Sequence, residues 1–400
     1  MSLNSAVWRN PRLSGRIPEL DGIRGLAILL VLLYHYILIG THPALHTWQW
    51  FAVGPLRFAW SGVDLFFVLS GFLIGGILYD ARTSENYYRT FYFRRAYRIL
   101  PIYFIWLALF MAGLYLAGPR STGPVHSLFN RDLPWWSYFL FLQNFFMSAH
   151  RDFGPQWLRI TWSLAVEEQF YLLLPWFVRN LRGRALIIVT AAAILGAPVF
   201  RFCLWLSGND YYGPYTLLLS RADGLGMGVL IAMACRNERA WNWLAARRRY
   251  LYLALLLFGC GAAFLYLRHY VEGRPFYVFG ISWVAAFYAT LLALAVVNPG
   301  RIVMLIFGNS LLKRLGTVAY AVYIFHEGVH RLLYLVFFGT EPDIRDWPSL
   351  GVTLLSLAIV MLLAALSWRV LEHPLIRRAH AKYRYAPQTP QVDVSSSAPN

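Results

Sequence analysis

Charged residues are scarce in this chain of 400 residues, and acidic residues are scarcer than basic ones. Only 14% of the residues are charged while 58% are hydrophobic, which excludes an ordinary soluble domain because too much apolar surface would meet water. Three cysteines occur without a CxxC spacing, so neither a disulfide framework nor a thiolate metal site is expected. The composition predicts a protein whose solvent is a lipid bilayer.

The basic excess gives a formal net charge of +17, carried mostly by arginine. A surplus of this size is compatible with nucleic-acid binding, with anionic lipid or with the cytoplasmic loops of a membrane protein. The arginines fall in short clusters between long apolar runs, which is the pattern of cytoplasmic loops. We therefore expect membrane lipid, and no nucleic acid, among the partners.

Ten apolar runs are long enough to cross a membrane as helices of roughly 20 residues. They predict an all-α polytopic membrane protein with about ten transmembrane helices. The expected spans lie at residues 23–40, 60–79, 99–118, 162–179, 185–206, 216–235, 250–268, 278–297, 317–337 and 349–371.

Two further segments near these runs are not expected to span or to be removed. Residues 135–147 are apolar but short, so we expect them to lie in the interface or to re-enter the membrane. The first run follows about twenty mostly polar residues that include Glu19 and Asp21, and it lacks a small-residue cleavage site. We therefore expect a retained helix and no secretory signal peptide.

The basic clusters set the orientation of the chain. With ten crossings they all fall on one side, and the opposite loops carry fewer, scattered cations, so both termini are expected to be cytoplasmic. This gives a cytoplasmic segment at 1–22, a transmembrane domain at 23–371, and a basic tail at 372–400 that is disordered from Ala386 onward. The clusters lie at residues 9–16, 82–98, 182–184, 236–249, 313–314 and 377–384.

Many ionisable residues fall inside the predicted helices, where lipid makes them costly unless they face the bundle interior. A rise of about 1.5 Å per residue places most of them at a similar depth. The simplest interpretation is one polar cluster in the outer half of the membrane, formed by His35, Asp64, Glu167, Glu168, Arg221, Asp223, His326, Glu327 and His330.

Arg24 and His35 are eleven residues apart, so they share one face of the first helix at an axial separation of about 16 Å. That face would link the cytoplasmic end to the polar cluster. Each residue also has a structural interpretation: Arg24 as a cation that snorkels to the membrane border, and His35 as a partner in helix packing.

The other candidates leave alternatives open. Asp64 is favoured as the structural partner of a buried arginine. Glu167 and Glu168 are adjacent and point about 100° apart, so one is available for chemistry while the other pairs with Arg221. Arg95 and Arg98 are three residues apart and would meet on one helix face, where they either grip phosphate oxygens or set the topology.

Five segments together resemble the membrane-bound acyltransferase family three. The run PELDGIRGLA at 18–27 leads to His35 and is similar to the family's opening motif, whose first helix carries an Arg-x10-His pattern. The other four segments are GVDLFFVLSGFLI at 62–74, FRRAYRILP at 93–101, TWSLAVEEQFY at 161–171 and SRADGLGMG at 220–228. They occur in the family's order, and the resemblance covers residues 18–375.

The resemblance implies an enzyme of the bacterial inner membrane that moves an acyl group from cytoplasmic acyl-CoA to a hydroxyl. The acceptor in this family is commonly a carbohydrate and sometimes a small molecule. Arg24 and His35 match the family's functional pair, and Arg95 with Arg98 match its Arg-x-x-Arg motif. Because the chain ends about thirty residues after its last predicted helix, a stand-alone member without a soluble esterase-like domain is expected.

We expect Arg24, Arg95 and Arg98 to hold acyl-CoA as a substrate, with no permanently bound cofactor. His35 would act as general base on the acceptor hydroxyl, and Glu167 or Glu168 would orient the imidazole. A covalent acyl-enzyme remains the alternative within this class. A transporter with a charged core is the rival, but it predicts an internal inverted repeat, which the sequence lacks. The acceptor, the acyl chain length and the oligomeric state stay open.

Overall fold

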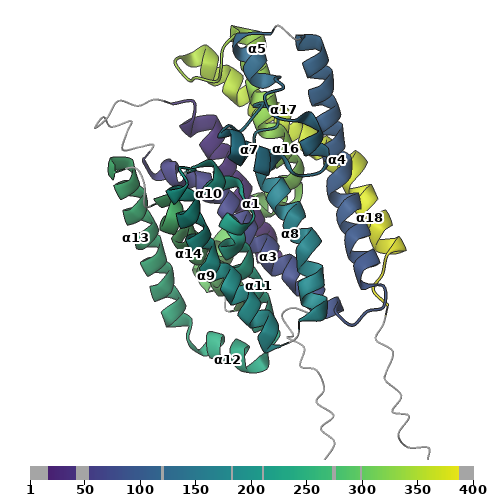
Figure 1. Cartoon of the computed structure of the whole chain (residues 1–400), viewed down its shortest axis with the longest axis vertical. Helices are drawn as coiled ribbons and strands as arrows, with labels where there is room; N and C mark the ends of the chain where they lie inside the picture. The colour runs from purple at the N-terminus through teal and green to yellow at the C-terminus, as the bar shows by residue number, and fades with distance from the viewer. Residues whose placement is uncertain are drawn as a thin grey trace, which may run out of the picture.

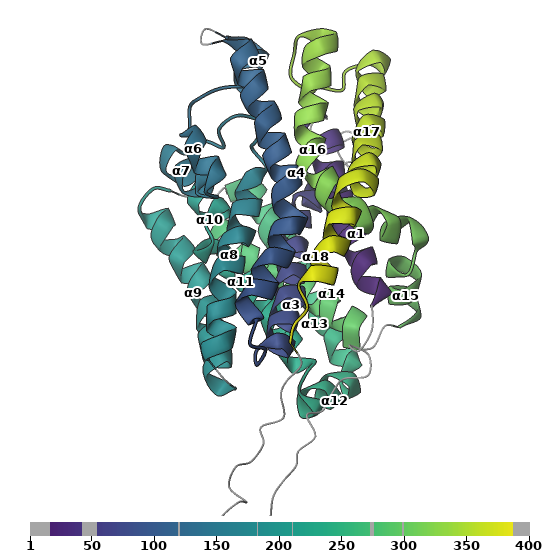
Figure 2. The same ribbon diagram turned by 90° about the vertical axis from the view of Figure 1, so that its right-hand side faces the viewer.

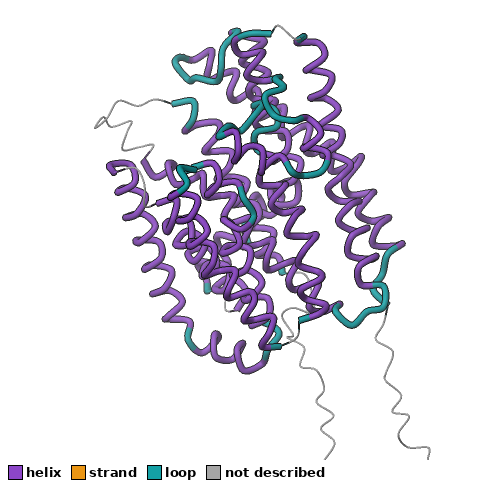
Figure 3. Tube along the Cα trace, viewed as in Figure 1, coloured by secondary structure: helices purple, strands orange, loops and turns teal. Residues whose placement is uncertain are grey.

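A computed structural model describes residues 17–41, 54–118, 121–181, 183–209, 211–272, 276–297 and 300–386. All regular structure in these ranges is helical (Figure 3). The predicted segment at 1–22 and the tail beyond Ala386 therefore lie largely outside the described residues. The principal helices are α1 (Pro18–Leu33), α3 (Gly62–Ala81), α4 (Tyr87–Ala117), α8 (Thr161–Asn180), α9 (Arg184–Leu206), α11 (Ala222–Ala234), α13 (Arg248–Glu272), α14 (Ile281–Val297), α16 (Ser310–Phe338) and α17 (Trp347–Ser367).

Shorter elements connect and extend these helices. Two of them, α6 and α7, occupy the apolar stretch at 135–147 and are too short to span, as the sequence predicts. The shorter elements are η2 (Tyr34–Leu38), η3 (Gly54–Ser61), α5 (Gly123–Leu128), α6 (Trp135–Phe139), α7 (Gln143–His150), α10 (Tyr212–Thr216), η4 (Leu219–Arg221), α12 (Glu238–Ala246), η5 (Phe276–Gly280), α15 (Arg301–Phe307), η6 (Trp368–Glu372) and α18 (His373–Lys382).

The described part of the chain contains seven helical segments that are long and apolar enough to cross a membrane. The protein is thus an all-α polytopic membrane protein. The other three predicted spans correspond to α8, α11 and α16, of which α8 and α16 carry several charged residues and α11 has 13 residues. The number of ten and the cytoplasmic termini stay predictions. The last segment runs from Trp347 to Lys382, past the expected end at residue 371.

The long helices run side by side along the long axis of the molecule, with α1 and α3 inside the bundle (Figure 1). The short helix α12 lies across one end, between α11 and α13 (Figure 1). Seen from the side, α18 follows the lower half of α4, and α16 and α17 rise together at the opposite end (Figure 2). This arrangement brings α1, α3, α4, α8 and α16 around one interior space.

Glycines allow the central helices to touch backbone to backbone. A Cβ atom on Gly316 of α16 would lie 2.0 Å from the carbonyl oxygen of Asp21, and one on Gly25 of α1 would lie 1.9 Å from that of Leu312. Inside a membrane, helix association depends on close packing of this kind, because lipid supplies no hydrophobic driving force between helices. The α1–α16 contact therefore fixes the distance between the side chains that these two helices present.

The topology can be tested at two exposed positions, Glu85 between α3 and α4 and Arg345 between α16 and α17. The two loops lie at opposite ends of the bundle (Figures 1 and 2). Cysteines introduced singly at Glu85 and at Arg345 should react with an impermeant maleimide from opposite sides of the membrane, Glu85 from the cytoplasm. Labelling of both cysteines from one side would contradict the fold.

The α1–α16 contact can be tested at Gly316. Because its Cβ would strike backbone, Gly316→Ala should lower the stability of the purified protein by about 1 to 3 kcal/mol, the usual cost of overpacking. Gly351 of α17 is the matched control, since a Cβ atom there meets nothing within 4 Å. Thermal unfolding in detergent should show a lower Tm for Gly316→Ala alone; equal Tm values would show that the two helices are not in such close contact.

Candidate functional site

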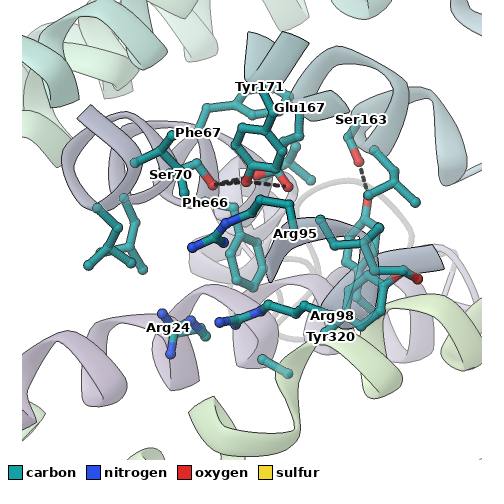
Figure 4. Close-up of a pocket in the computed structure, with 18 of the residues that line it drawn as sticks. Arg24, Phe66, Phe67, Ser70, Arg95, Arg98, Ser163, Glu167, Tyr171 and Tyr320 are labelled. Atoms are coloured by element: carbon teal, nitrogen blue, oxygen red, sulfur yellow. Dashed lines mark hydrogen bonds between the residues drawn. The ribbon is translucent and has the colours of Figure 1, made fainter. Parts of the chain in front are cut away.

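A cavity of about 240 Å³ lies between α1, α3, α4, α8 and α16 (Figure 4). This volume is several times the roughly 30 Å³ that one water occupies, so the cavity has room for a chain of heavier atoms. Three arginines mark one end, and apolar side chains from α3 line the middle. The polar residues along it are Arg24, Ser70, Arg95, Arg98, Ser163, Glu167, Tyr171, Tyr320 and Tyr323.

The basic end combines Arg24 with Arg95 and Arg98, as the sequence predicts. Arg95 and Arg98 stand three residues apart on α4 and share a face, and all three guanidinium groups point into the same space (Figure 4). Arg24 forms an ion pair with Asp21 at 2.9 Å. Within the described ranges, neither Arg95 nor Arg98 forms an ion pair, so two cations remain available for an anionic ligand.

Of the two adjacent glutamates, Glu167 is the one that lines the cavity. Its carboxylate accepts hydrogen bonds from Ser70 at 2.6 Å and from Tyr171 at 3.4 Å (Figure 4). Glu168 points elsewhere, and its Oε1 atom is buried without a hydrogen-bond partner. Neighbours on a helix point about 100° apart, so only one of the two glutamates can face the cavity. The sequence left open which one it is, and in the structure it is Glu167.

At the other end of the cavity, a chain of contacts leads to His35. The hydroxyl groups of Ser163 and Tyr323 lie 2.5 Å apart. His326 Nδ1 lies 2.6 Å from the carbonyl oxygen of Tyr323, and the His326 ring is 4.8 Å from the ring of His35 between centroids. His35 is therefore placed next to the cavity, beyond Tyr323, and not within its lining.

The hydrogen bonds define the tautomer of each ring. His35 Nδ1 lies 2.9 Å from the carbonyl oxygen of Val31, so a neutral His35 donates from Nδ1 and keeps Nε2 free to accept a proton. His326 donates from Nδ1 in the same way, and its Nε2 atom is buried without a partner. Each neutral ring thus carries an unprotonated Nε2, and the two ring centroids lie 4.8 Å apart.

Local backbone geometry also distinguishes His35. The α-helix α1 ends at Leu33, and the wider π-helix η2 covers residues Tyr34–Leu38. Such turns are rare and occur frequently at functional sites, because the extra residue per turn redirects a side chain. The sequence predicted a continuous helix here, since no glycine or proline marks the change.

A buried group of ion pairs lies beside His35 and His326. Glu327 is 2% exposed, accepts from Arg331 at 3.0 Å and lies 3.5 Å from Arg159. Glu327 directly follows His326, whose ring lies 4.8 Å from that of His35 between centroids. Sequence reasoning missed Arg159 and Arg331, although the spacing of four between Glu327 and Arg331 is the signal of a helical ion pair.

The remaining buried charges form a separate, structural group. Asp64 pairs with Arg221 at 2.6 Å, and Asp223 pairs with Arg201 at 2.9 Å, with all four side chains at most 3% exposed. The prediction that Asp64 is the partner of a buried arginine is confirmed. The prediction that a glutamate of the Glu167–Glu168 pair binds Arg221 is wrong, because the carboxylate that pairs with Arg221 is Asp64, while Glu167 bonds Ser70 and Tyr171.

The single polar cluster expected from the sequence is thus divided into three bonded groups. Glu167 belongs to the cavity, His35 with His326 and Glu327 to its end, and Asp64 to the ion pairs. Depth along a helix axis does not specify the direction in which a side chain points around that axis. Among the described residues, no group of three or more His, Cys, Asp and Glu is arranged to hold a metal ion.

Fold and site together define a helical membrane protein with a cavity between its central helices, which has an arginine-rich end and, beyond Tyr323 of its lining, a histidine pair. The particular family follows from its matching sequence model: the chain belongs to the acyltransferase domain family, which matches residues 17–369. No solved structure shows significant similarity to the chain.

Two relatives are similar over most of this chain. The peptidoglycan O-acetyltransferase OatA of Listeria monocytogenes is 27% identical over 396 residues, covering 92% of this chain and 57% of the relative. The O-acetyltransferase OatA of Staphylococcus aureus is 24% identical over 402 residues, covering 93% of this chain and 59% of the relative. The chain therefore spans somewhat more than half the length of these relatives.

The cationic end can be tested by neutralising its two unpaired arginines. The double variant Arg95→Gln, Arg98→Gln should bind radiolabelled CoA at least roughly tenfold more weakly, because each lost charge-assisted hydrogen bond is worth about 1.5 to 3 kcal/mol. Lysine at both positions should restore only part of the affinity, since a point charge replaces a bidentate fork.

The matched control for this test is Arg239→Gln with Arg249→Gln, two exposed arginines on and beside α12. It removes the same charge and should leave CoA affinity unchanged. Thermal unfolding of each purified variant checks that folding is intact. If the Arg95 and Arg98 variant binds CoA like the parent, the two arginines are topology signals only.

Proposed function

We propose that this protein is an integral membrane O-acyltransferase that moves an acyl group from cytoplasmic acyl-CoA to a hydroxyl of a carbohydrate acceptor. The observation that carries the proposal is the cavity that connects Arg24, Arg95 and Arg98 with the end near His35. Membership of the acyltransferase domain family and the names of the two O-acetyltransferase relatives support the reaction class. A bacterial inner membrane is the proposed location.

In this proposal the charged part of the donor stays at the basic end. The phosphates of CoA bind Arg95 and Arg98, assisted by Arg24, while the uncharged pantetheine arm extends past Ser70 and Glu167 along the apolar middle. Because phosphate is costly to bring into lipid, only the neutral arm and the acyl group enter the membrane. This places the thioester near Ser163 and Tyr323, next to the histidine pair.

His35 then acts as the general base. Its free Nε2 takes the proton of the acceptor hydroxyl while the hydroxyl oxygen attacks the thioester carbonyl. The new carbon–oxygen bond forms, the carbon–sulfur bond breaks, and the thiolate leaves and takes the proton back from the imidazolium as CoA thiol. His326, whose Nε2 is also unpartnered, lies next to His35 and can accept a hydrogen bond from a second hydroxyl of the carbohydrate acceptor.

Glu327 is better placed than Glu167 or Glu168 to stabilise the imidazolium. It directly follows His326, whose ring lies 4.8 Å from that of His35, whereas Glu167 is engaged by Ser70 and Tyr171. A second carboxylate oxygen, Glu327 Oε2, is buried without a partner and keeps accepting capacity. We therefore assign the charge-stabilising role to Glu327 and leave to Glu167 the positioning of the pantetheine arm.

For the acceptor we propose a hydroxyl on a glycan, with acetyl as the acyl group. The support is the peptidoglycan named for one relative, together with a cavity of modest volume. Incubating membranes with radiolabelled acetyl-CoA and glycan acceptors, followed by mass spectrometry of the product, tests both assignments. An acylated product without glycan would contradict the acceptor class.

The role of His35 is tested by His35→Gln. Glutamine keeps a hydrogen bond but cannot act as a base near neutral pH, so turnover should fall by roughly 100-fold or more while CoA binding stays unchanged. His126→Gln, an exposed histidine far along the chain, is the control and should retain parental turnover. A folded His35→Gln protein with full activity would show that His35 is a packing residue.

A further inference from the structure

The chain after α18 folds back onto the first turns of α4. Residues 383–386, which we name the C-terminal strap, are extended and bonded to α4 and the turn before it. Arg94 Nε donates to the carbonyl oxygen of Tyr383 at 2.7 Å, and Asn86 Nδ2 donates to that of Arg384 at 2.6 Å. The amide of Ala386 donates in return to Asn86 Oδ1 at 2.9 Å. The strap is thus held in one position beside α4, where α18 also packs (Figure 2).

Several cations lie close to the aromatic rings of the strap. The ring of Tyr383 stacks on Phe93 with centroids 4.6 Å apart and planes 7° apart. The guanidinium of Arg89 lies 6.0 Å from the centre of the Tyr383 ring, and Lys382 Nζ lies 5.5 Å from it. Arg94 lies 5.2 Å from the centre of the Tyr385 ring.

These cations have no acidic partner in the part of the chain that the structure describes. Arg89, Arg94 and Lys382 make no ion pair with a described carboxylate, so ring faces and one carbonyl oxygen are their main contacts. Repulsion between like charges raises the free energy of such a cluster of cations unless a bound anion neutralises them. Charges that only set topology need no such fixed positions.

The strap borders the basic end of the cavity. Arg94 precedes Arg95 and lies one helical turn, about 6 Å along the axis, from Arg98. His380 of α18 and Tyr385 of the strap lie within electrostatic range of Arg94 and Arg95. The hydroxyl oxygen of Tyr385 is buried and has no hydrogen-bond partner, which leaves a polar atom available beside these cations.

We propose that α4 and the C-terminal strap form a second phosphate subsite, which binds the 3′-phosphate of CoA through Arg94 and Lys382, with Arg89 nearby. This inference rests on the proposed function, in which the arginines of the cavity hold the pyrophosphate. CoA carries both groups on one ribose, so a second cationic site a single helical turn away matches the spacing of its phosphates. A phosphomonoester brings close to two negative charges, and fixed guanidinium and ammonium groups bind it by charge-assisted hydrogen bonds.

A lipid headgroup would offer the same phosphate chemistry. The donor nucleotide is favoured because Arg94 is half-buried beside the cavity arginines and because Tyr383 is only 8% exposed. A lipid phosphate does not require cations beside the cavity, and exposed cations such as Arg239 and Arg249, on and beside α12, would serve it equally well.

The experiment compares binding of CoA and of 3′-dephospho-CoA to the full chain in detergent. The parent should bind CoA at least roughly tenfold more tightly, the scale of one charge-assisted hydrogen bond. Arg94→Gln with Lys382→Gln should lose this preference and bind dephospho-CoA like the parent. Lys382→Gln alone changes an exposed side chain and should lose part of the preference, which excludes a folding defect as the cause.

The other outcomes are distinguishable. Equal binding of the two ligands by the parent would overturn the subsite. A double variant that keeps the preference for CoA would overturn it as well. If the double variant keeps this preference but binds less well to phosphatidylcholine vesicles that contain phosphatidylglycerol, the cations are assigned to lipid. Absence of any CoA binding by the parent would refute the proposed function itself, whereas parental binding without preference would refute only the subsite.

Discussion

The cost of an unpaired charge inside a membrane governs this structure. Four buried charges meet that cost by pairing: Asp64 with Arg221, and Asp223 with Arg201. These pairs tie α3, α9 and α11 together, and removing one partner of a buried pair typically costs about 3 to 5 kcal/mol. By contrast, Arg95 and Arg98 of the cavity form no ion pair with a described residue. An anionic ligand bound to these arginines would neutralise their charge. This is the physical basis for proposing that the phosphates of the donor bind at this end.

Much of the fold follows from patterns local to the sequence. Apolar length located the long helices, and the charges of α8 and α16 explain why those two are less apolar than the rest. Arg95 and Arg98 were expected on one face because a spacing of three residues is nearly one helical turn. Arg24 reached the same cavity through the close α1–α16 contact, which small residues at Gly25 and Gly316 permit.

The partners of the site residues depended on tertiary packing and could not be predicted. Rotation about a helix axis decides whether Glu167 or Glu168 faces the cavity, and apolar neighbours on every side leave a bundle helix without an amphipathic signal. His35 meets His326 within η2, a π-helical stretch that no glycine or proline in the sequence indicates. Arg201 was not among the buried charges named from the sequence, and its partner Asp223 lies 22 residues further along the chain.

The geometry separates the two ends of the proposed reaction by charge. In the proposed reaction, a highly charged nucleotide would meet Arg24, Arg95 and Arg98 at one end, whereas the histidine end presents neutral ring nitrogens and one compensated carboxylate, Glu327. A donor therefore has one favourable orientation, with its phosphates outside the apolar middle and its thioester at His35. In the proposed reaction, the same asymmetry would keep the nucleotide from following its acyl group, because Arg95 and Arg98 would bind the phosphates before the apolar side chains of α3 are reached. Transfer to an acceptor that approaches from the far side then requires movement of the acyl group alone.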